Sequence, residues 1–152
     1  MRLKLAAVPL IALALTACGG NPDTPAGRAA DARHESFEEM GDAFKVVSDQ
    51  LAASSTDMAA IGAAAGTINT LASKVETWFP AGSGPEDGIK TDALQTVWTK
   101  PDEFKAAAAK LVGEAGKFSA LVQAGDKAAV GEGMKALGGA CKGCHDKFRE
   151  KE

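Results

Sequence analysis

Two thiols and an imidazole lie within five residues near the C-terminus, in the segment Cys141-Lys142-Gly143-Cys144-His145. A C-x-x-C-H run is the attachment signature of haem c. Each thiol can add across one vinyl group of the porphyrin, and the adjacent histidine can place a ring nitrogen on the iron. Two cysteines three positions apart share one side of a helix. The segment therefore predicts one covalent haem c, attached through Cys141 and Cys144, with His145 as its axial iron ligand.

Other interpretations of the paired cysteines are weaker. A thioredoxin-like redox motif belongs to a βαβ context, and the sequence shows no such pattern. A structural zinc site needs four ligands, and His34 is the only other histidine. A disulfide within a C-x-x-C run on a helix would be strained. Haem attachment is therefore the favoured interpretation.

The elements that must position this segment are helices. Apolar residues recur at spacings of three and four in four stretches, which predict helices over residues 31–53, 58–77, from 101 to about 124, and 127–151. Residues 78–100 form a longer connection with several prolines and glycines, and a short helical turn over 92–98. This pattern predicts an all-α fold, an antiparallel four-helix bundle with haem c near the C-terminal helix.

The expected last helix carries both cysteines on its apolar face. Its apolar positions are spaced by three and four: Val130, Met134, Leu137, Cys141, Cys144 and Phe148. The thiols should therefore point into the core. Four glycines in the same helix weaken it by up to about 1 kcal/mol each, and we expect them to leave room for a planar cofactor: Gly131, Gly133, Gly138 and Gly139.

The N-terminus resembles a bacterial lipoprotein signal. A short basic start and an apolar run too short to span a bilayer precede Leu15-Thr16-Ala17-Cys18-Gly19. We expect residues 1–17 to be a signal peptide, Cys18 to be acylated, and residues 18–29 to be a flexible tether to a domain over 30–152. A plain signal peptide with an unrelated cysteine is the alternative. Because Gly19 is not the aspartate associated with inner-membrane retention, an outer-membrane anchor facing the periplasm is slightly favoured.

The charge balance argues against a nucleic-acid partner. The whole chain has a formal net charge of −3, and removal of residues 1–17 takes away Arg2 and Lys4, leaving 15 basic against 20 acidic side chains. An acidic domain would repel a phosphate backbone.

The bundle pattern and the position of the haem motif resemble the cytochrome c′ family, the class II c-type cytochromes. The resemblance is carried by residues 33–41, by 141–149 and, less specifically, by the middle segments 78–84 and 90–98. It implies that Arg33 lies near the haem propionates, followed by His34 where relatives often have glutamine. It also places Thr91 at the cofactor and Arg149 beside the proximal histidine, although Arg149 also suits a surface position at a helix C-terminus. Homodimers through the first two helices are a further expectation.

The residue over the open face of the haem decides the expected function. The resemblance places Phe37 there, and phenylalanine cannot ligate iron, whereas low-spin relatives carry methionine. We therefore expect a five-coordinate, high-spin iron that binds NO and CO and cycles one electron with an unknown redox partner. The alternative is a low-spin electron carrier with Met40 as sixth ligand, although core packing of Met40 is favoured. His34 is a weaker distal candidate. No distal acid–base pair is apparent near Phe37, so we expect no enzyme beyond weak peroxidase activity.

Overall fold

The computed structural model describes residues 21–151; the expected signal peptide and the first three residues of the expected tether, Cys18 among them, lie outside this range. Within it the chain is helical, as predicted. The helices are α1 (Pro25–Ala52), α2 (Met58–Ala72), α3 (Thr96–Thr99), α4 (Pro101–Ala124) and α5 (Lys127–Phe148), with two 3₁₀ turns, Val75–Trp78 and Pro85–Asp87, between α2 and α3.

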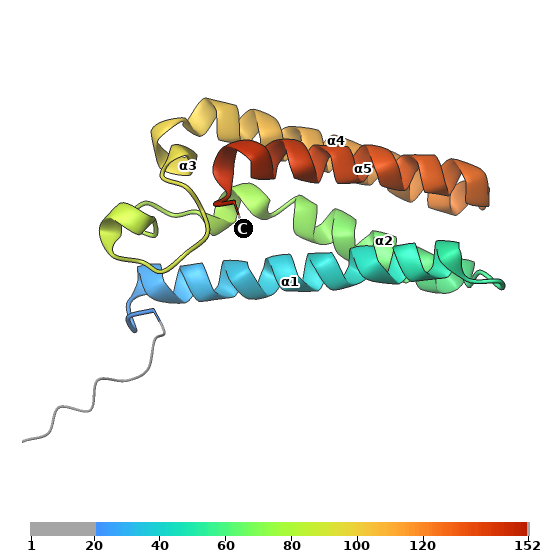
Figure 1. Cartoon of the computed structure of the whole chain (residues 1–152), viewed down its shortest axis with the longest axis horizontal. Coiled ribbons are helices and arrows are strands. Elements are labelled where there is room, and N and C mark those ends of the chain that lie inside the picture. The colour runs from blue at the N-terminus through green and yellow to red at the C-terminus, as the bar shows by residue number, and fades with distance from the viewer. Residues whose placement is uncertain (1–20, 152) are drawn as a thin grey trace, which may run out of the picture.

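Four long helices form the predicted antiparallel bundle (Figure 1). Helix α1 packs along α2, α2 against α4, and α4 against α5, whereas α1 and α5 meet at few positions. The short connections α1–α2 and α4–α5 reverse the chain direction, and the long connection between α2 and α4 covers one end of the bundle. The bundle is therefore closed on three sides and open between its first and last helices.

Side-chain caps fix where the helices begin. The carboxylates of Asp57 and Asp126 each accept two backbone N–H groups, from the first turns of α2 and α5. Each such cap stabilises a helix by about 1 kcal/mol. Gly125 ends α4 in the left-handed region at φ 76°. Because this conformation suits glycine, the tight turn into α5 is set by the local sequence.

The start of α1 corrects the predicted tether. The helix begins at Pro25 rather than at residue 31, so residues 25–29 are helical and not part of a flexible linker. The hydroxyl of Thr24 accepts the N–H of Gly27 at 3.0 Å, and Pro25 occupies the first helical position. Proline suits that position because its missing N–H would have no partner there.

Two other helix ends also differ from prediction. Helix α2 ends at Ala72 and continues as a 3₁₀ turn from Val75, where a single helix to residue 77 was predicted. Helix α5 ends at Phe148, three residues before its predicted end. Arg149 is extended and pairs with Ala93 as an isolated antiparallel bridge, so the backbone leaves the helix to bond the middle loop, the connection of residues 73–100 between α2 and α4.

Apolar side chains fill the end of the bundle near the α1–α2 and α4–α5 turns. The most completely buried apolar residues are Phe118, Ile61, Ile68, Leu137, Val47 and Val130. Complete burial of each such side chain stabilises the fold by about 1.5–3 kcal/mol. No helix within residues 21–151 is long and apolar enough to cross a lipid bilayer.

One of the four α5 glycines, Gly133, has a role other than the one predicted. A Cβ on Gly133 would lie 2.6 Å from Cδ1 of Leu121 on α4, so Gly133 permits close packing of α4 and α5. A Cβ on Gly138 would lie 3.4 Å from the Phe44 ring, an ordinary contact, and one on Gly131 or Gly139 would meet nothing within 4 Å. The glycine at 133 therefore serves helix packing rather than making room for a cofactor.

Candidate functional site

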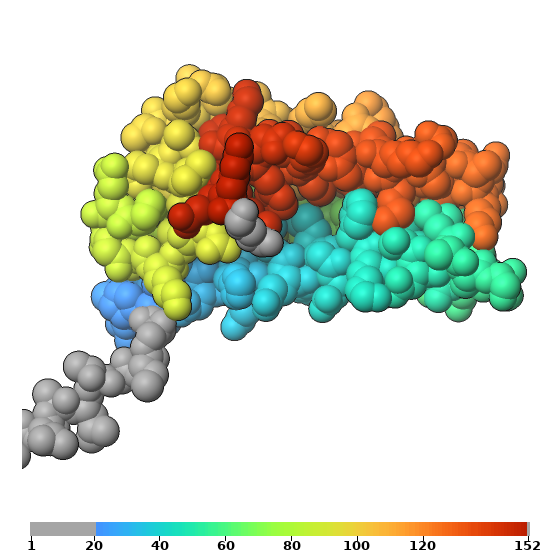
Figure 2. Space-filling view, in the orientation of Figure 1, coloured from blue at the N-terminus to red at the C-terminus, as the bar shows by residue number. Residues whose placement is uncertain are grey.

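A large cavity opens between α1 and α5 at the end covered by the middle loop. Its volume is about 880 Å³, and its walls are mostly apolar. Helices α1, α4 and α5 and the loop residues 90–93 all contribute to the lining. In Figure 2 the residues that follow α5 meet this loop above the start of α1, at the same end of the molecule. The volume lies within the range of cofactor pockets, roughly 300–1,000 Å³.

Both cysteines of the C-x-x-C-H segment line this cavity and are half-buried. Burial raises the pKa of the Cys141 thiol, and burial followed by the neighbouring Cys141 raises the pKa of Cys144 to about 11. The two thiols are therefore protonated at neutral pH and sit on the apolar side of α5. This is the placement predicted from the spacing of the apolar residues.

His145 lies at the rim of the same cavity and is exposed on one side. Desolvation by the protein atoms around the ring lowers the pKa of His145, and the charge of Arg149 acts in the same direction. At neutral pH the imidazole is therefore uncharged, which is the form that binds a metal.

Arg33 is a buried cation in the cavity wall, only 3% exposed. Its Nη1 donates to the hydroxyl of Ser83 at 2.9 Å, and its Nη2 donates to the Ser83 carbonyl at 2.8 Å and to the Thr91 hydroxyl at 2.7 Å. The guanidinium carbon also lies 5.0 Å from the Phe79 ring centre and 5.5 Å from that of Trp98. Burial lowers the pKa of Arg33. The charge is thus held by neutral oxygens and aromatic faces, beside the cavity.

The three remaining α1 candidates all line the cavity but differ in burial. Phe37 is partly buried and stacks edge-on against Trp78, with ring centres 5.0 Å apart. Met40 is 7% exposed and belongs to the main apolar core. His34 is on the rim with its side chain 68% exposed, and its Nε2 lies 3.3 Å from a carboxylate oxygen of Glu38. Phe37 therefore presents the apolar wall, and His34 faces the outer edge.

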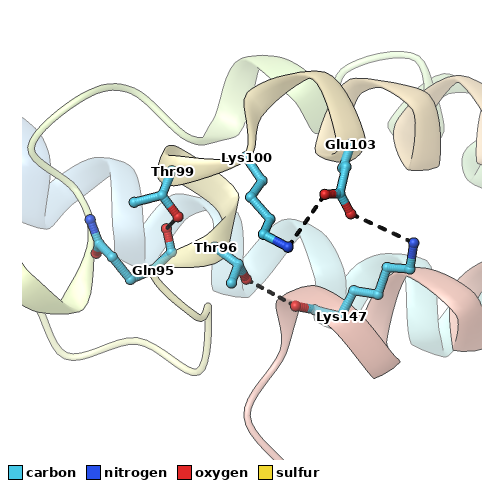
Figure 3. A network of polar contacts seen from close by, with 6 residues as sticks. All are labelled: Gln95, Thr96, Thr99, Lys100, Glu103 and Lys147. Atoms are coloured by element: carbon cyan, nitrogen blue, oxygen red, sulfur yellow. Dashed lines mark hydrogen bonds and ion pairs between the residues drawn. The ribbon is translucent and has the colours of Figure 1, made fainter.

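The middle loop and the end of α5 are joined by several polar contacts. The N–H of Leu94 donates to the carbonyl of Phe148 at 2.9 Å. Figure 3 shows a second set, in which the Thr96 hydroxyl donates to the Lys147 carbonyl at 2.9 Å and Glu103 lies between Lys100 and Lys147. These contacts hold the haem-motif end of α5 against α3 and α4.

Arg149 lies in this junction as well as in the cavity lining. Its N–H donates to the His145 carbonyl at 3.1 Å, and its guanidinium lies 3.8 Å from a carboxylate oxygen of Asp92. The side chain is partly exposed. The structure therefore places Arg149 beside His145, and also at the helix C-terminus, so both sequence interpretations describe the same position.

Of the residues that hold Arg33, sequence reasoning named Thr91 as a site residue but missed Ser83, Phe79 and Trp98. Ser83 is completely buried, and Phe79 and Trp98 stack with ring centres 5.8 Å apart. The one available indication was that Arg33 lies four residues before Phe37, on the apolar face of α1. A charged residue on such a face needs polar partners when it is buried.

The site fits a covalently attached haem. Two thiols and an imidazole from one helix line a mostly apolar cavity of suitable volume, and a buried cation without a carboxylate hydrogen bond stands in its wall. A four-helix bundle with this site defines a c-type cytochrome of the bundle class. The family model described as cytochrome c′ matches residues 28–149. The chain therefore belongs to the cytochrome c′ family, and its cofactor is covalent haem c, as the sequence predicted.

Known relatives agree with this assignment. Cytochrome c′ of Pararhodospirillum photometricum is 37% identical over 119 residues, which cover 78% of this chain and 93% of the relative. The crystal structure of cytochrome c′ from Rubrivivax gelatinosus matches with a TM-score of 0.75 at 32% identity, covering 82% of this chain and 97% of that one. A nitric oxide complex of a mutant cytochrome c′ from Alcaligenes xylosoxidans matches with a TM-score of 0.71 at 26% identity, covering 83% and 97%.

Proposed function

We propose that Cys141 and Cys144 attach the haem and that His145 is its axial iron ligand. Each thiol would form a thioether by adding its sulfur to one carbon and its hydrogen to the other carbon of one haem vinyl group. The half-buried thiols on one face of α5 support this assignment. The lowered pKa of His145 supports a neutral, ligating imidazole. Arg33, with Thr91 fixing its guanidinium, offers a positive charge to the propionates.

We further propose a five-coordinate, high-spin haem that binds NO and CO. When bound, the haem supplies an iron that accepts an axial imidazole and a diatomic ligand and cycles between Fe(III) and Fe(II). The observation that carries this proposal is Phe37, which lines the cavity from α1 and is fixed by Trp78. Phenylalanine has no donor atom, so Phe37 would not ligate the iron of a haem held in this cavity, and its bulk would limit the access of ligands to that iron.

An apolar distal wall favours NO and CO over O₂. Bound O₂ is stabilised by hydrogen-bond donors, and Phe37 offers none. The nearest acid–base pair, His34 and Glu38, is about two-thirds exposed on the rim. Peroxidase-type proton transfer needs a pair within hydrogen-bond reach of the reacting atoms. We therefore propose a gas-binding and one-electron protein rather than an enzyme.

The proposed setting is the periplasm, with Cys18 acylated and anchored to the outer membrane. The tether is shorter than predicted, since α1 begins at Pro25. Acyl chains contribute about 0.8 kcal/mol per buried CH₂, so a multiply acylated N-terminus holds the domain at the membrane. The redox partner is unidentified, and a homodimer through α1 and α2 stays a prediction.

Absorption spectra of the reduced protein with and without CO test this function. We expect a broad high-spin spectrum that shifts on CO binding. Phe37→Met should give a low-spin haem, because it places a thioether where the phenyl ring lies. The matched control is Phe44→Met, seven residues along the same helix face. A sharp low-spin band in the wild type that CO does not change would contradict the open site and favour the alternative with Met40 as sixth ligand.

A further inference from the structure

Residues 21–24, the docked N-terminal segment, fold back against the first turn of α1. The N–H of Thr24 donates to the Pro22 carbonyl at 2.7 Å, and Asp23 pairs with Arg28. A Cβ on Gly27 would collide with the Pro22 carbonyl oxygen, so only glycine allows the segment to lie here. Residues 21–24 are therefore packed on the first turn of α1.

The side chain of Asn21 fastens this segment to the middle loop. Its Nδ2 donates to the Lys90 carbonyl at 3.1 Å and to Oδ1 of Asp31 at 2.7 Å, and its Oδ1 accepts the Lys90 N–H at 2.7 Å. One amide thus pairs with both backbone groups of a residue 69 positions away. Asn21, Asp31 and Lys90 all line the haem cavity. The first described residue is consequently fixed at the edge of the site.

This docking shortens the distance between the proposed lipid anchor and the cavity. An extended chain spans at most about 3.6 Å per residue, so Cys18 lies within about 11 Å of Asn21. If residues 21–24 were not docked, Cys18 could lie up to about 25 Å from Pro25, the first residue held by the bundle. We propose that the docked N-terminal segment holds the cavity end of the bundle against a phospholipid surface. The inference rests on the acylation of Cys18 proposed above.

The orientation arises from the tether and not from charge. Without residues 1–17 the chain has 15 basic and 20 acidic side chains, and at this end the exposed acids Asp23, Glu86 and Asp87 accompany the exposed cations Arg28 and Lys90, so the surface has no excess of positive charge. Such a surface is not attracted to anionic lipids. The same orientation should therefore form on uncharged phosphatidylcholine vesicles. A cavity beside the headgroups would receive small apolar gases directly from the bilayer.

Spin labels at the two ends of the bundle test the orientation. The full-length holoprotein is reconstituted into phosphatidylcholine vesicles that contain a nickel-chelating headgroup. Nitroxides are placed at Glu86→Cys, in the middle loop, and at Ser55→Cys, beyond the C-terminus of α1, both exposed. Helix α1 has 28 residues and is about 42 Å long. We expect nickel to relax the label at position 86 at least three-fold more than the label at 55.

Two variants release the docked segment in different ways. Asn21→Ala removes the bonds to Lys90, and Gly27→Ala displaces Pro22. In each variant the contrast, which is the ratio of nickel-induced relaxation at position 86 to that at position 55, should fall at least two-fold. The controls are Asn69→Ala on the exposed face of α2 and Gly116→Ala on α4, where an added Cβ meets nothing within 4 Å. Equal relaxation at both labels in the wild type, or full contrast in Asn21→Ala, would overturn the docking.

The same vesicles separate this inference from the proposed gas binding. A normal CO response with no contrast between labels overturns the docking and leaves gas binding supported. Full contrast without a CO response overturns the gas binding and supports the docking. Wild-type protein that does not sediment with the vesicles overturns the lipid anchor, and the docking proposal with it.

Discussion

Ser83→Ala tests whether the middle loop holds the buried Arg33 cation. The Ser83 hydroxyl accepts Nη1 of Arg33 and donates to the Pro80 carbonyl at 2.8 Å. In the variant the Pro80 carbonyl still accepts a hydrogen bond from Nε1 of Trp98, at 3.0 Å. Arg33 keeps the carbonyl of residue 83 and the Thr91 hydroxyl. The substitution therefore removes two hydrogen bonds and leaves most of their partners satisfied.

The expected loss of unfolding free energy is about 2–3 kcal/mol. A hydrogen bond to a charged donor contributes about 1.5–3 kcal/mol and a neutral one about 0.5–1.5 kcal/mol, and the remaining bonds of Arg33 keep the loss near the lower sum. For a domain of this size the loss lowers the melting temperature by about 10 °C.

Urea unfolding of the holoprotein in a Cys18→Ser background measures this loss. The midpoint should fall while the dependence on urea concentration stays unchanged, because the surface exposed on unfolding is the same. Ser73→Ala is the matched control, since Ser73 is exposed and donates only to the nearby Thr70 carbonyl, at 2.7 Å. It should change stability by less than about 0.5 kcal/mol. If Ser83→Ala costs no more than Ser73→Ala, the network does not hold Arg33.

Three further changes test the fold, the open site and the anchor. Gly133→Ala should destabilise by about 1–3 kcal/mol because its Cβ would press on Leu121, whereas Gly131→Ala should stabilise α5 slightly; equal melting temperatures would contradict this packing. Met40→Leu should leave the CO spectrum unchanged and cost less than about 1.5 kcal/mol; a change from low-spin to high-spin would identify Met40 as an iron ligand. Cys18→Ser should move the protein into the soluble fraction on membrane fractionation, and retention in the membrane would contradict acylation.

The fold and the haem-bearing helix were predictable because their signals are local. The spacing of apolar residues with Cys141 and Cys144 fixes which face of α5 is buried, and no distant contact changes that phase. The helix starts at Asp57 and Asp126 follow equally local capping rules. The start of α1 was missed although Thr24 and Pro25 form a cap and first turn, because no apolar period accompanies them.

The rest depends on contacts between distant residues. Ser83 meets Arg33 across 50 positions, and a single serine in a loop rich in glycine and proline gives no sign of burial. The end of α5 is set by pairing of Arg149 with Ala93 in the middle loop, which no local pattern predicts. Gly133 could be recognised as unusual in a helix, but its role follows from the position of α4.

The location of the two tryptophans makes one end of this molecule visible by fluorescence. The chain has two Trp and no Tyr. Trp78 packs on Phe37, and Trp98 lies over Arg33 and Phe79, so both indoles are beside the haem cavity. Haem quenches the fluorescence of nearby tryptophans, so the intact protein should emit little tryptophan fluorescence. Unfolding of the cavity end should therefore increase the tryptophan emission, whereas unfolding of the opposite end, which contains neither tryptophan, should leave it unchanged. Comparison of emission with far-UV circular dichroism would thus show which half of the bundle opens first.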